Sequence, residues 1–255
     1  AGADAASGDA FYMAIFDGER ITRTGMDART DGVMTAAHLG EVTADYLYEA
    51  PQTGGGVLKH RFGCSGIDGT TFAPLPGDAG GRVYCCVAYG VYGDVTRADN
   101  DHQVILAYDP DELTAAALPL DPADVHRSGP AAAGRYFVYT GNTHYGVQNL
   151  EYEAETGRMY MAVYRGKKPV FPNYAMYVTD WNAPPRRARL AGFGDGTEGD
   201  TAPLWRAGLY DAESGVFGWN FRYGSTGMIA LGGGEFYFSR EERRGDEFAS
   251  EIVLY

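Results

Sequence analysis

Lysine is scarce in this 255-residue chain, which holds three lysines and carries a formal net charge of −13. A nucleic-acid-binding surface needs clustered positive charge, so this balance argues against DNA or RNA as a partner. Cysteine is equally scarce, and the spacing of Cys64, Cys85 and Cys86 suits neither a disulfide framework nor a zinc site. We expect all three cysteines to be buried as small apolar side chains.

Long apolar runs are also absent. No stretch approaches the roughly 18–20 residues of a membrane-spanning helix, so no membrane span is expected. The first ten residues show no charged segment followed by an apolar run, and no signal peptide is visible. The sequence lacks a Walker loop, a G-x-S-x-G elbow and an H-E-x-x-H motif, which disfavours nucleotide hydrolysis and serine-esterase chemistry.

What the chain does contain is a series of short apolar or alternating segments, rich in Tyr, Phe, Val and Ile and separated by Gly, Asp and Pro. This composition and punctuation are typical of β-strands. Residues 27–42 could form a helix or a loop with a short strand. We therefore predict an all-β protein with one domain, residues 1–255. Strands are expected at residues 11–17, 81–89, 102–109, 135–141, 158–164, 174–180, 235–241 and 251–255.

Three segments of the chain align as internal repeats: RFGCSGI (61–67), HYGVQNL (144–150) and RYGSTGM (222–228). Each reads cation, aromatic, Gly, two variable residues, Gly or Asn, and an aliphatic residue. A Gly-rich turn and an aromatic strand follow each one. A repeated unit of antiparallel strands is typical of a β-propeller, in which each blade buries its faces against its neighbours. With 17–19 expected strands, we predict a five-bladed propeller or part of a larger one.

Propeller geometry would bring several loops to one end of the ring. These loops hold all three lysines together with several arginines and histidines, whereas the opposite turns are acidic or neutral. A concentrated positive field with aromatic neighbours suits an anionic, partly apolar ligand. We therefore expect an acidic oligosaccharide or polysaccharide as the ligand. The residues predicted to bind it are His60, Arg61, Tyr92, Arg97, Arg165, Lys167, Lys168, Tyr174, Trp219, Arg222 and Tyr223.

His144 and Tyr145 stand at the start of a predicted inner strand. An imidazole and a phenol are a competent base and acid, so this pair suits β-elimination of a uronate whose carboxylate is neutralised by Arg or Lys. Hydrolysis would instead need two carboxylates, for which Asp68 and Glu151 are the candidates. A plainer interpretation makes these acids ordinary turn and strand-end residues, and His144 a hydrogen-bonding residue.

Two loops, residues 97–103 and 194–201, have the oxygen density of calcium-binding loops. Neither has the twelve-residue EF-hand pattern, and turn-forming Asp and Asn explain both loops equally well. The sequence therefore requires no cofactor, and calcium is the one metal that it suggests.

Residues 87–109, 136–174 and 218–239 resemble a group of β-propeller proteins found among the secreted glycan-degrading systems of bacteria, which include sialidase-like and rhamnosyl-glucuronate-processing propellers. The resemblance covers most of residues 60–255. It implies a polysaccharide lyase or a glycoside hydrolase with an active site at the channel mouth, in some members with a calcium ion in the channel. A secreted or periplasmic location is implied as well. A glycan-binding propeller without catalysis is the remaining alternative.

Overall fold

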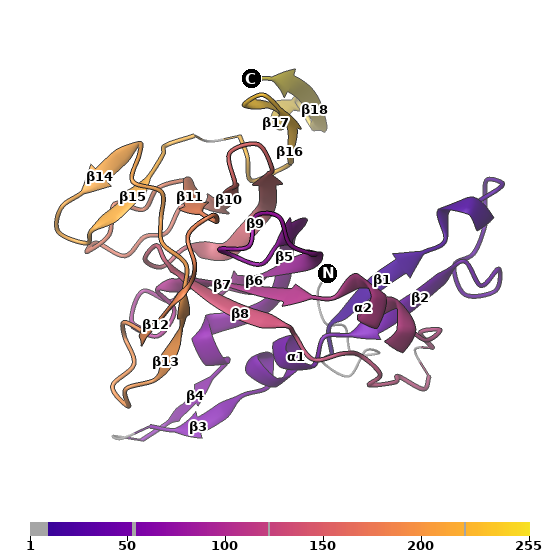
Figure 1. Ribbon diagram of the computed structural model, residues 1–255, viewed down its shortest axis with the longest axis horizontal. Helices are drawn as coiled ribbons and strands as arrows, with labels where there is room; N and C mark the ends of the chain where they lie inside the picture. The colour runs from indigo at the N-terminus through magenta and orange to yellow at the C-terminus, as the bar shows by residue number, and fades with distance from the viewer. Residues whose placement is uncertain (1–9, 53–54, 122, 222) are drawn as a thin grey trace.

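Strands dominate the fold. The computed structural model describes residues 10–52, 55–121, 123–221 and 223–255, and within these ranges it has eighteen strands and two short α-helices (Figure 1). The predicted all-β class is confirmed. The strands are β1 (Tyr12–Phe16), β2 (Met34–His38), β3 (Glu49–Pro51), β4 (Val57–Lys59), β5 (Cys64–Pro74), β6 (Val83–Val91), β7 (His102–Tyr108), β8 (Gly134–Tyr139), β9 (His144–Glu153), β10 (Arg158–Tyr164), β11 (Met176–Asp180), β12 (Arg186–Arg189), β13 (Glu198–Thr201), β14 (Leu209–Asp211), β15 (Val216–Gly218), β16 (Met228–Gly232), β17 (Glu235–Arg244) and β18 (Glu247–Leu254).

The largest sheet has six strands in the order β12-β13-β8-β7-β6-β5. Strands β5 to β8 form an antiparallel meander, and β13 joins β8 in parallel. Every residue of β7 is buried, because β6 and β8 flank it and side chains cover both faces of the sheet. That burial explains why β7 reads as a nearly continuous apolar run.

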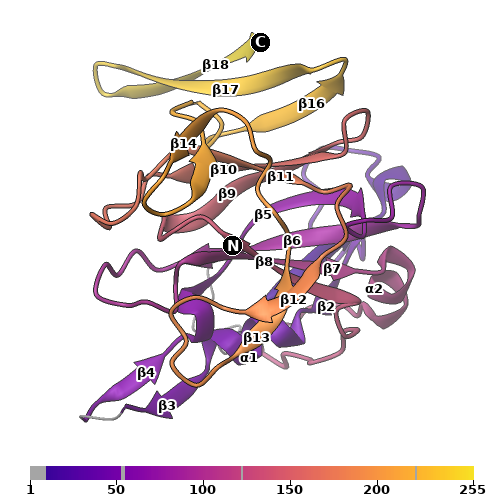
Figure 2. The same cartoon turned by 60° about the vertical axis from the view of Figure 1, so that its left-hand side comes forward.

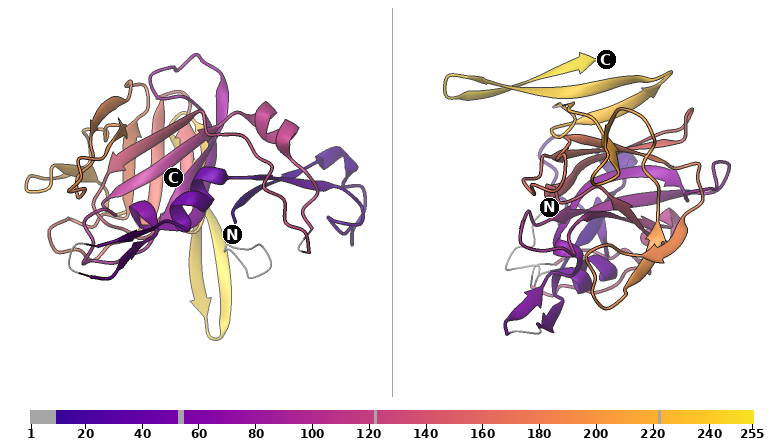
Figure 3. Two further views of the ribbon diagram at one scale, coloured as in Figure 1. Left: turned by 90° about the horizontal axis from the view of Figure 1, so that it is seen from below. Right: turned by 90° about the vertical axis from the view of Figure 1, so that its left-hand side faces the viewer.

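Two three-stranded antiparallel sheets follow along the chain, β11-β10-β9 and β16-β17-β18. Three two-stranded hairpins, β1-β2, β3-β4 and β14-β15, complete the structure. The β17–β18 hairpin projects well beyond the body of the molecule (Figure 3). Several of its apolar side chains are exposed, including Tyr237, Phe248 and Ile252.

The two helices are short. The ambiguous segment 27–42 contains both a strand and the start of a helix, since β2 ends at His38 and α1 (Gly40–Tyr46) begins two residues later. The second helix, α2 (Pro110–Ala116), has Asp109 as its N-cap, whose carboxylate accepts a hydrogen bond from the backbone N–H of Asp111.

The sheets stack in chain order, and Figure 2 shows them as successive layers. Strand β9 contacts β5 and β6 on one side and β16 on the other. The approach of β5 to β9 is close: a Cβ atom on Gly69 would lie 2.8 Å from the backbone nitrogen of Leu150, so a side chain larger than hydrogen does not fit there. The aligned segments 61–67, 144–150 and 222–228 reach into β5, β9 and β16, each of which is the first strand of its sheet in chain order.

The predicted propeller ring is wrong for the described residues. The β16–β18 sheet lies at one end of the stack, and the helix α1 lies near the other end, so the sheets do not close into a circle (Figures 1 and 2). The physical reason is that the repeat specifies how one sheet packs on the next, whereas closure requires the last sheet to return to the first.

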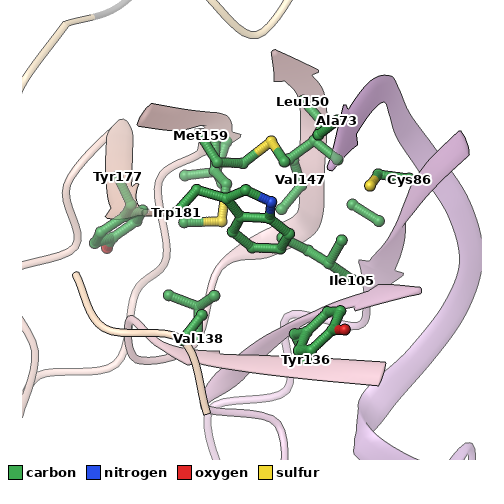
Figure 4. Close-up of a cluster of buried hydrophobic side chains, with 14 of the residues drawn as sticks. Ala73, Cys86, Ile105, Tyr136, Val138, Val147, Leu150, Met159, Tyr177 and Trp181 are labelled. Carbon is green, nitrogen blue, oxygen red and sulfur yellow. The ribbon is translucent and has the colours of Figure 1, made fainter. Parts of the chain in front are cut away.

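Two apolar cores hold the stack together. One lies between the six-stranded sheet and β9–β11, and Figure 4 shows Trp181 at its centre among Met159, Val147 and Ile105. The other lies on the opposite face of the six-stranded sheet, where Leu39 and Val42 cover Tyr89 and its neighbours.

The three cysteines are free and buried, which confirms their predicted place in the core. Burial raises the pKa of the Cys85 thiol to about 11, because the thiolate would lose its hydration. No helix within the described ranges is long and apolar enough to cross a membrane.

Candidate functional site

Four of the loops that the sequence predicts at one end of the fold contact one another: 59–63, 90–101, 141–146 and 165–173. A Cβ atom on Gly93 would lie 2.6 Å from Nδ1 of His144, and the side-chain nitrogen of Asn142 donates to the carbonyl of Tyr92 over 3.4 Å. The loop after β10 reaches the loop before β7 through Lys168. The question for each predicted cation is then whether it faces a ligand or another part of the protein.

Lys168 is engaged inside the protein. Its side chain is buried, and Nζ lies 2.5 Å from a carboxylate oxygen of Asp101, 2.5 Å from the carbonyl oxygen of Arg97 and 3.3 Å from Oδ1 of Asn100. An ammonium group has three donors, and these three acceptors use all of them. Lys168 therefore joins two loops, and its charge is balanced by Asp101.

Arg97 is similarly engaged. Its guanidinium donates to the carbonyls of Lys59 and His60 over 2.7 and 2.8 Å, and it pairs with the Asp99 carboxylate at 2.7 Å. The neighbouring predicted residues have partners of their own: His60 Nδ1 lies 2.6 Å from the carbonyl oxygen of Tyr46, Tyr92 packs against the His60 ring, and Arg61 lies over the rings of Tyr48 and Phe62. These contacts fix the loop that leads into β5.

A second group of predicted residues lies where β9 begins and β10 ends. His144 is opposite Tyr164 in the strand register, and the rings of His144 and Tyr145 are 4.0 Å apart. Tyr145 has a φ of +66°, a left-handed conformation that is uncommon for a residue with a side chain. This backbone turns the exposed Tyr145 ring toward Tyr164, at 6.2 Å between centroids.

A cavity of about 490 Å³ opens beside Tyr164, between the β9–β11 and β16–β18 sheets. We call it the tyrosine cleft. From one sheet come Tyr164 and Arg165, and from the other come Tyr223, Thr226, Arg240 and Glu241. The Arg240 guanidinium lies over the Tyr223 ring at 5.4 Å. Arg165 uses its Nε to donate to the carbonyl of Asn173 over 2.8 Å, which leaves its terminal N–H groups for other acceptors.

The two predicted carboxylates, Asp68 and Glu151, each accept hydrogen bonds from other parts of the protein. Asp68 accepts a hydrogen bond from the Gln148 amide at 3.0 Å, and the same amide donates to the Tyr145 carbonyl. Glu151 accepts from the backbone N–H of Ala230 at 2.9 Å and so ties β9 to β16. Burial raises the pKa of both carboxyl groups.

The remaining predicted residues are dispersed. Tyr174 is buried against Tyr177, and Trp219 stacks on Trp205; neither residue lines the tyrosine cleft. Lys167 is exposed close to Arg165 in the chain. Arg222 lies outside the described residues.

Sequence reasoning missed a second set of cations. Arg186, Arg189 and Arg206 line two adjoining cavities of about 540 and 410 Å³, which we call the arginine groove. The PPRRAR segment of the sequence was the available signal. The segment alone does not reveal the groove, because Arg206 and the buried His102 line it from other parts of the chain.

His102 should make stability depend on pH. Burial lowers its pKa from 6.5 to about 4, so between these values the unfolded chain binds a proton that the folded chain does not. The free energy of unfolding should therefore fall as the pH decreases from about 6.5 to about 4, by on the order of 3 kcal/mol in total.

Urea unfolding at several pH values, compared with His102→Gln, checks this prediction. The comparison is needed because the raised pKa of Asp68 and Glu151 produces the opposite slope. At about pH 5 the wild-type protein should have lost about 2 kcal/mol more than the variant, relative to pH 7. Parallel pH profiles for the two proteins would contradict the assignment.

Metal ligands do not gather in the part of the chain that the structure describes, where no group of three or more His, Cys, Asp or Glu side chains could hold an ion. In the two loops suggested for calcium, Asp99 pairs with Arg97, and Asp195 accepts hydrogen bonds from Thr197.

Comparison with protein-family models, curated proteins and solved structures found no match to this chain. The site must therefore be interpreted from its own geometry.

Proposed function

We propose that the protein binds an acidic glycan at the tyrosine cleft and cleaves it by β-elimination beside a uronate. The observation that carries the proposal is that the His144–Tyr145 ring pair, Tyr164 and Arg165 meet where β9 begins and β10 ends. They lie next to a cavity that Tyr223 and Arg240 complete.

The cleft is lined by Arg165 and Arg240 together with Glu241 and Glu242, and its arginines and tyrosines are the groups that suit such a ligand. Guanidinium groups bind carboxylates through two parallel hydrogen bonds, and Arg165 has its terminal N–H groups available. Tyrosine rings pack on the apolar faces of sugars and offer a hydroxyl at their edge. A volume of about 490 Å³ falls within the range of small-ligand sites.

Elimination removes the proton beside the uronate carboxylate and breaks the bond to the oxygen of the departing sugar. In the proposed reaction Arg165 neutralises the carboxylate, His144 accepts the proton, and Tyr145 donates one to the departing oxygen. The products are an unsaturated uronate and a new chain end. Hydrolysis is less well supported, because Glu151 already accepts a backbone hydrogen bond that joins two sheets.

The experiment incubates the protein with polygalacturonate, alginate, hyaluronan and, as a neutral control, a glucan. Binding is measured by calorimetry and elimination by the ultraviolet absorbance of the unsaturated product. We expect at least one acidic glycan to bind and to be cleaved. Arg165→Gln should weaken binding about tenfold to a hundredfold, the range for a lost charged hydrogen bond. His144→Ala should slow elimination at least about a hundredfold while binding persists.

Arg243→Gln is the matched control, because Arg243 is an exposed arginine near the tip of the β17–β18 hairpin and does not line the cleft. It should leave binding and cleavage unchanged. If new reducing ends form without unsaturated product, the reaction is hydrolysis and not elimination. Binding without any cleavage would identify the protein as a glycan-binding module. If none of the acidic glycans binds, the proposal is overturned.

A further inference from the structure

The arginine groove lies on a different part of the molecule from the tyrosine cleft, and no residue lines both cavities. Its two cavities adjoin along residues 201–206 and share Arg206. The edge strand β12 and its neighbour β13 border it on one side. The β14–β15 hairpin borders it on the other side.

The positive charge in this groove is not neutralised by the protein. In the described part of the chain, the guanidinium groups of Arg186, Arg189 and Arg206 make no ion pair or hydrogen bond to another residue. The larger cavity has no Asp or Glu among its lining residues. In the smaller cavity Asp180 is paired with Arg158 at 2.7 Å.

This arrangement is unusual for a chain with a net charge of −13. By contrast, Arg187, on β12 between Arg186 and Arg189, is paired with two carboxylates: Glu198 and Asp200 each lie 3.7 Å away. Three arginines and one carboxylate, the paired Asp180, line the groove. Such an excess of positive groups around a concave site raises the local concentration of anions.

The walls of the larger cavity combine polar groups with aromatic rings, and polar surface predominates. Tyr210 and Phe217 stack at 4.4 Å, and Tyr139 contributes another ring. A cavity of about 540 Å³ is large enough for a small organic molecule, whose apolar part can pack on these rings. The ligand should therefore combine negative charge with an apolar body.

His102 also stands in the wall of the larger cavity, next to Tyr139. The residue is 4% exposed, and its Nδ1 is buried with no hydrogen-bond partner among the described residues. This nitrogen is closed off from the cavity, so the anion-binding groups of the groove are the exposed arginines.

The groove is also rigidly supported. Ala202 donates its backbone N–H to Phe137 on β8, and Trp205 donates to Val178 on β11. The segment that leads to Arg206 is thus bonded to two sheets. Such support fixes the backbone that carries Arg206 before a ligand arrives, which reduces the entropy lost on binding.

From these observations we infer that the arginine groove is a binding site for a small organic dianion with an aromatic or other apolar body, in which Arg189 and Arg206 bind the anionic groups. The anionic groups are a phosphate monoester or two carboxylates, both of which a guanidinium fork recognises.

Isothermal titration calorimetry of the full chain tests this site with phenyl phosphate, phthalate and the neutral benzyl alcohol. We expect at least one dianion to bind, with an affinity that falls as salt is added, and benzyl alcohol not to bind measurably. Binding of phenyl phosphate alone assigns the site to phosphate esters, and binding of phthalate alone assigns it to dicarboxylates.

The variants Arg189→Gln and Arg206→Gln should each weaken dianion binding at least tenfold. Arg187→Gln is the matched control and should change it less than twofold. All three side chains are exposed, so thermal unfolding should show that the variants remain folded. Equal loss in Arg187→Gln, or no binding of either dianion, would overturn the inference. Because Arg165 lies in the other site, Arg165→Gln should leave dianion binding intact.

Discussion

Replacing Lys168 with methionine is expected to lower the free energy of unfolding by about 3–5 kcal/mol. Both members of the Lys168–Asp101 pair are buried, and removal of the ammonium group leaves a carboxylate without its counter-charge. The substitution also leaves the carbonyl of Arg97 and the Asn100 side chain without their donor. Urea denaturation with linear extrapolation measures the loss.

Two further variants separate the charge from other effects. Lys167→Met removes the neighbouring exposed lysine and should change the free energy of unfolding by less than about 0.5 kcal/mol. The double variant Lys168→Met with Asp101→Asn should recover part of the loss, because no buried charge then remains unpaired. A loss below about 1 kcal/mol in Lys168→Met would contradict a buried ion pair.

Trp181→Ala is expected to cost about 3–5 kcal/mol as well, for a different reason. The Trp181 side chain is 2% exposed, fills the space between the six-stranded sheet and β9–β11, and donates its indole N–H to the carbonyl of Pro74 at 2.8 Å. Truncation to alanine opens a cavity between the two sheets, as the surroundings of the ring in Figure 4 make clear.

The measurement is again urea unfolding. Trp181→Phe keeps most of the ring but loses the hydrogen bond to Pro74, so it should cost less than the alanine variant, about 1–3 kcal/mol. Phe72→Ala is the matched control, since Phe72 is an aromatic residue of β5 that is 61% exposed. A Trp181→Ala protein as stable as Phe72→Ala would show that the sheets do not depend on this core.

The sequence allowed the strands to be predicted, because their signal is local. All eight predicted strand segments overlap observed strands, and each of the three aligned segments reaches into the first strand of a sheet. Ring closure could not be predicted in the same way, because closure depends on how the last sheet meets the first. Residues 27–42 stayed ambiguous because a strand and a helix meet within them.

The site was harder to predict than the fold. The lysines were expected to face a ligand, yet the partner of Lys168 is Asp101, 67 residues away in the chain. The arginine groove is also made of distant residues, since residues 202–206 cross between β8 and β11 before presenting Arg206 beside β12. Such contacts between residues distant in the chain cannot be predicted from composition or from the spacing of residues.

The serial order of the sheets also determines how the molecule can come apart. Strand β9 is held between β5 and β16, whereas the β16–β18 sheet has its main contact with one neighbour, through β16 and β9. We therefore expect local unfolding to begin at the C-terminal sheet. This sheet can separate while the core around Trp181 stays packed and excludes water. Such fraying would dismantle the tyrosine cleft before the arginine groove, since Tyr223 and Arg240 line the cleft alone.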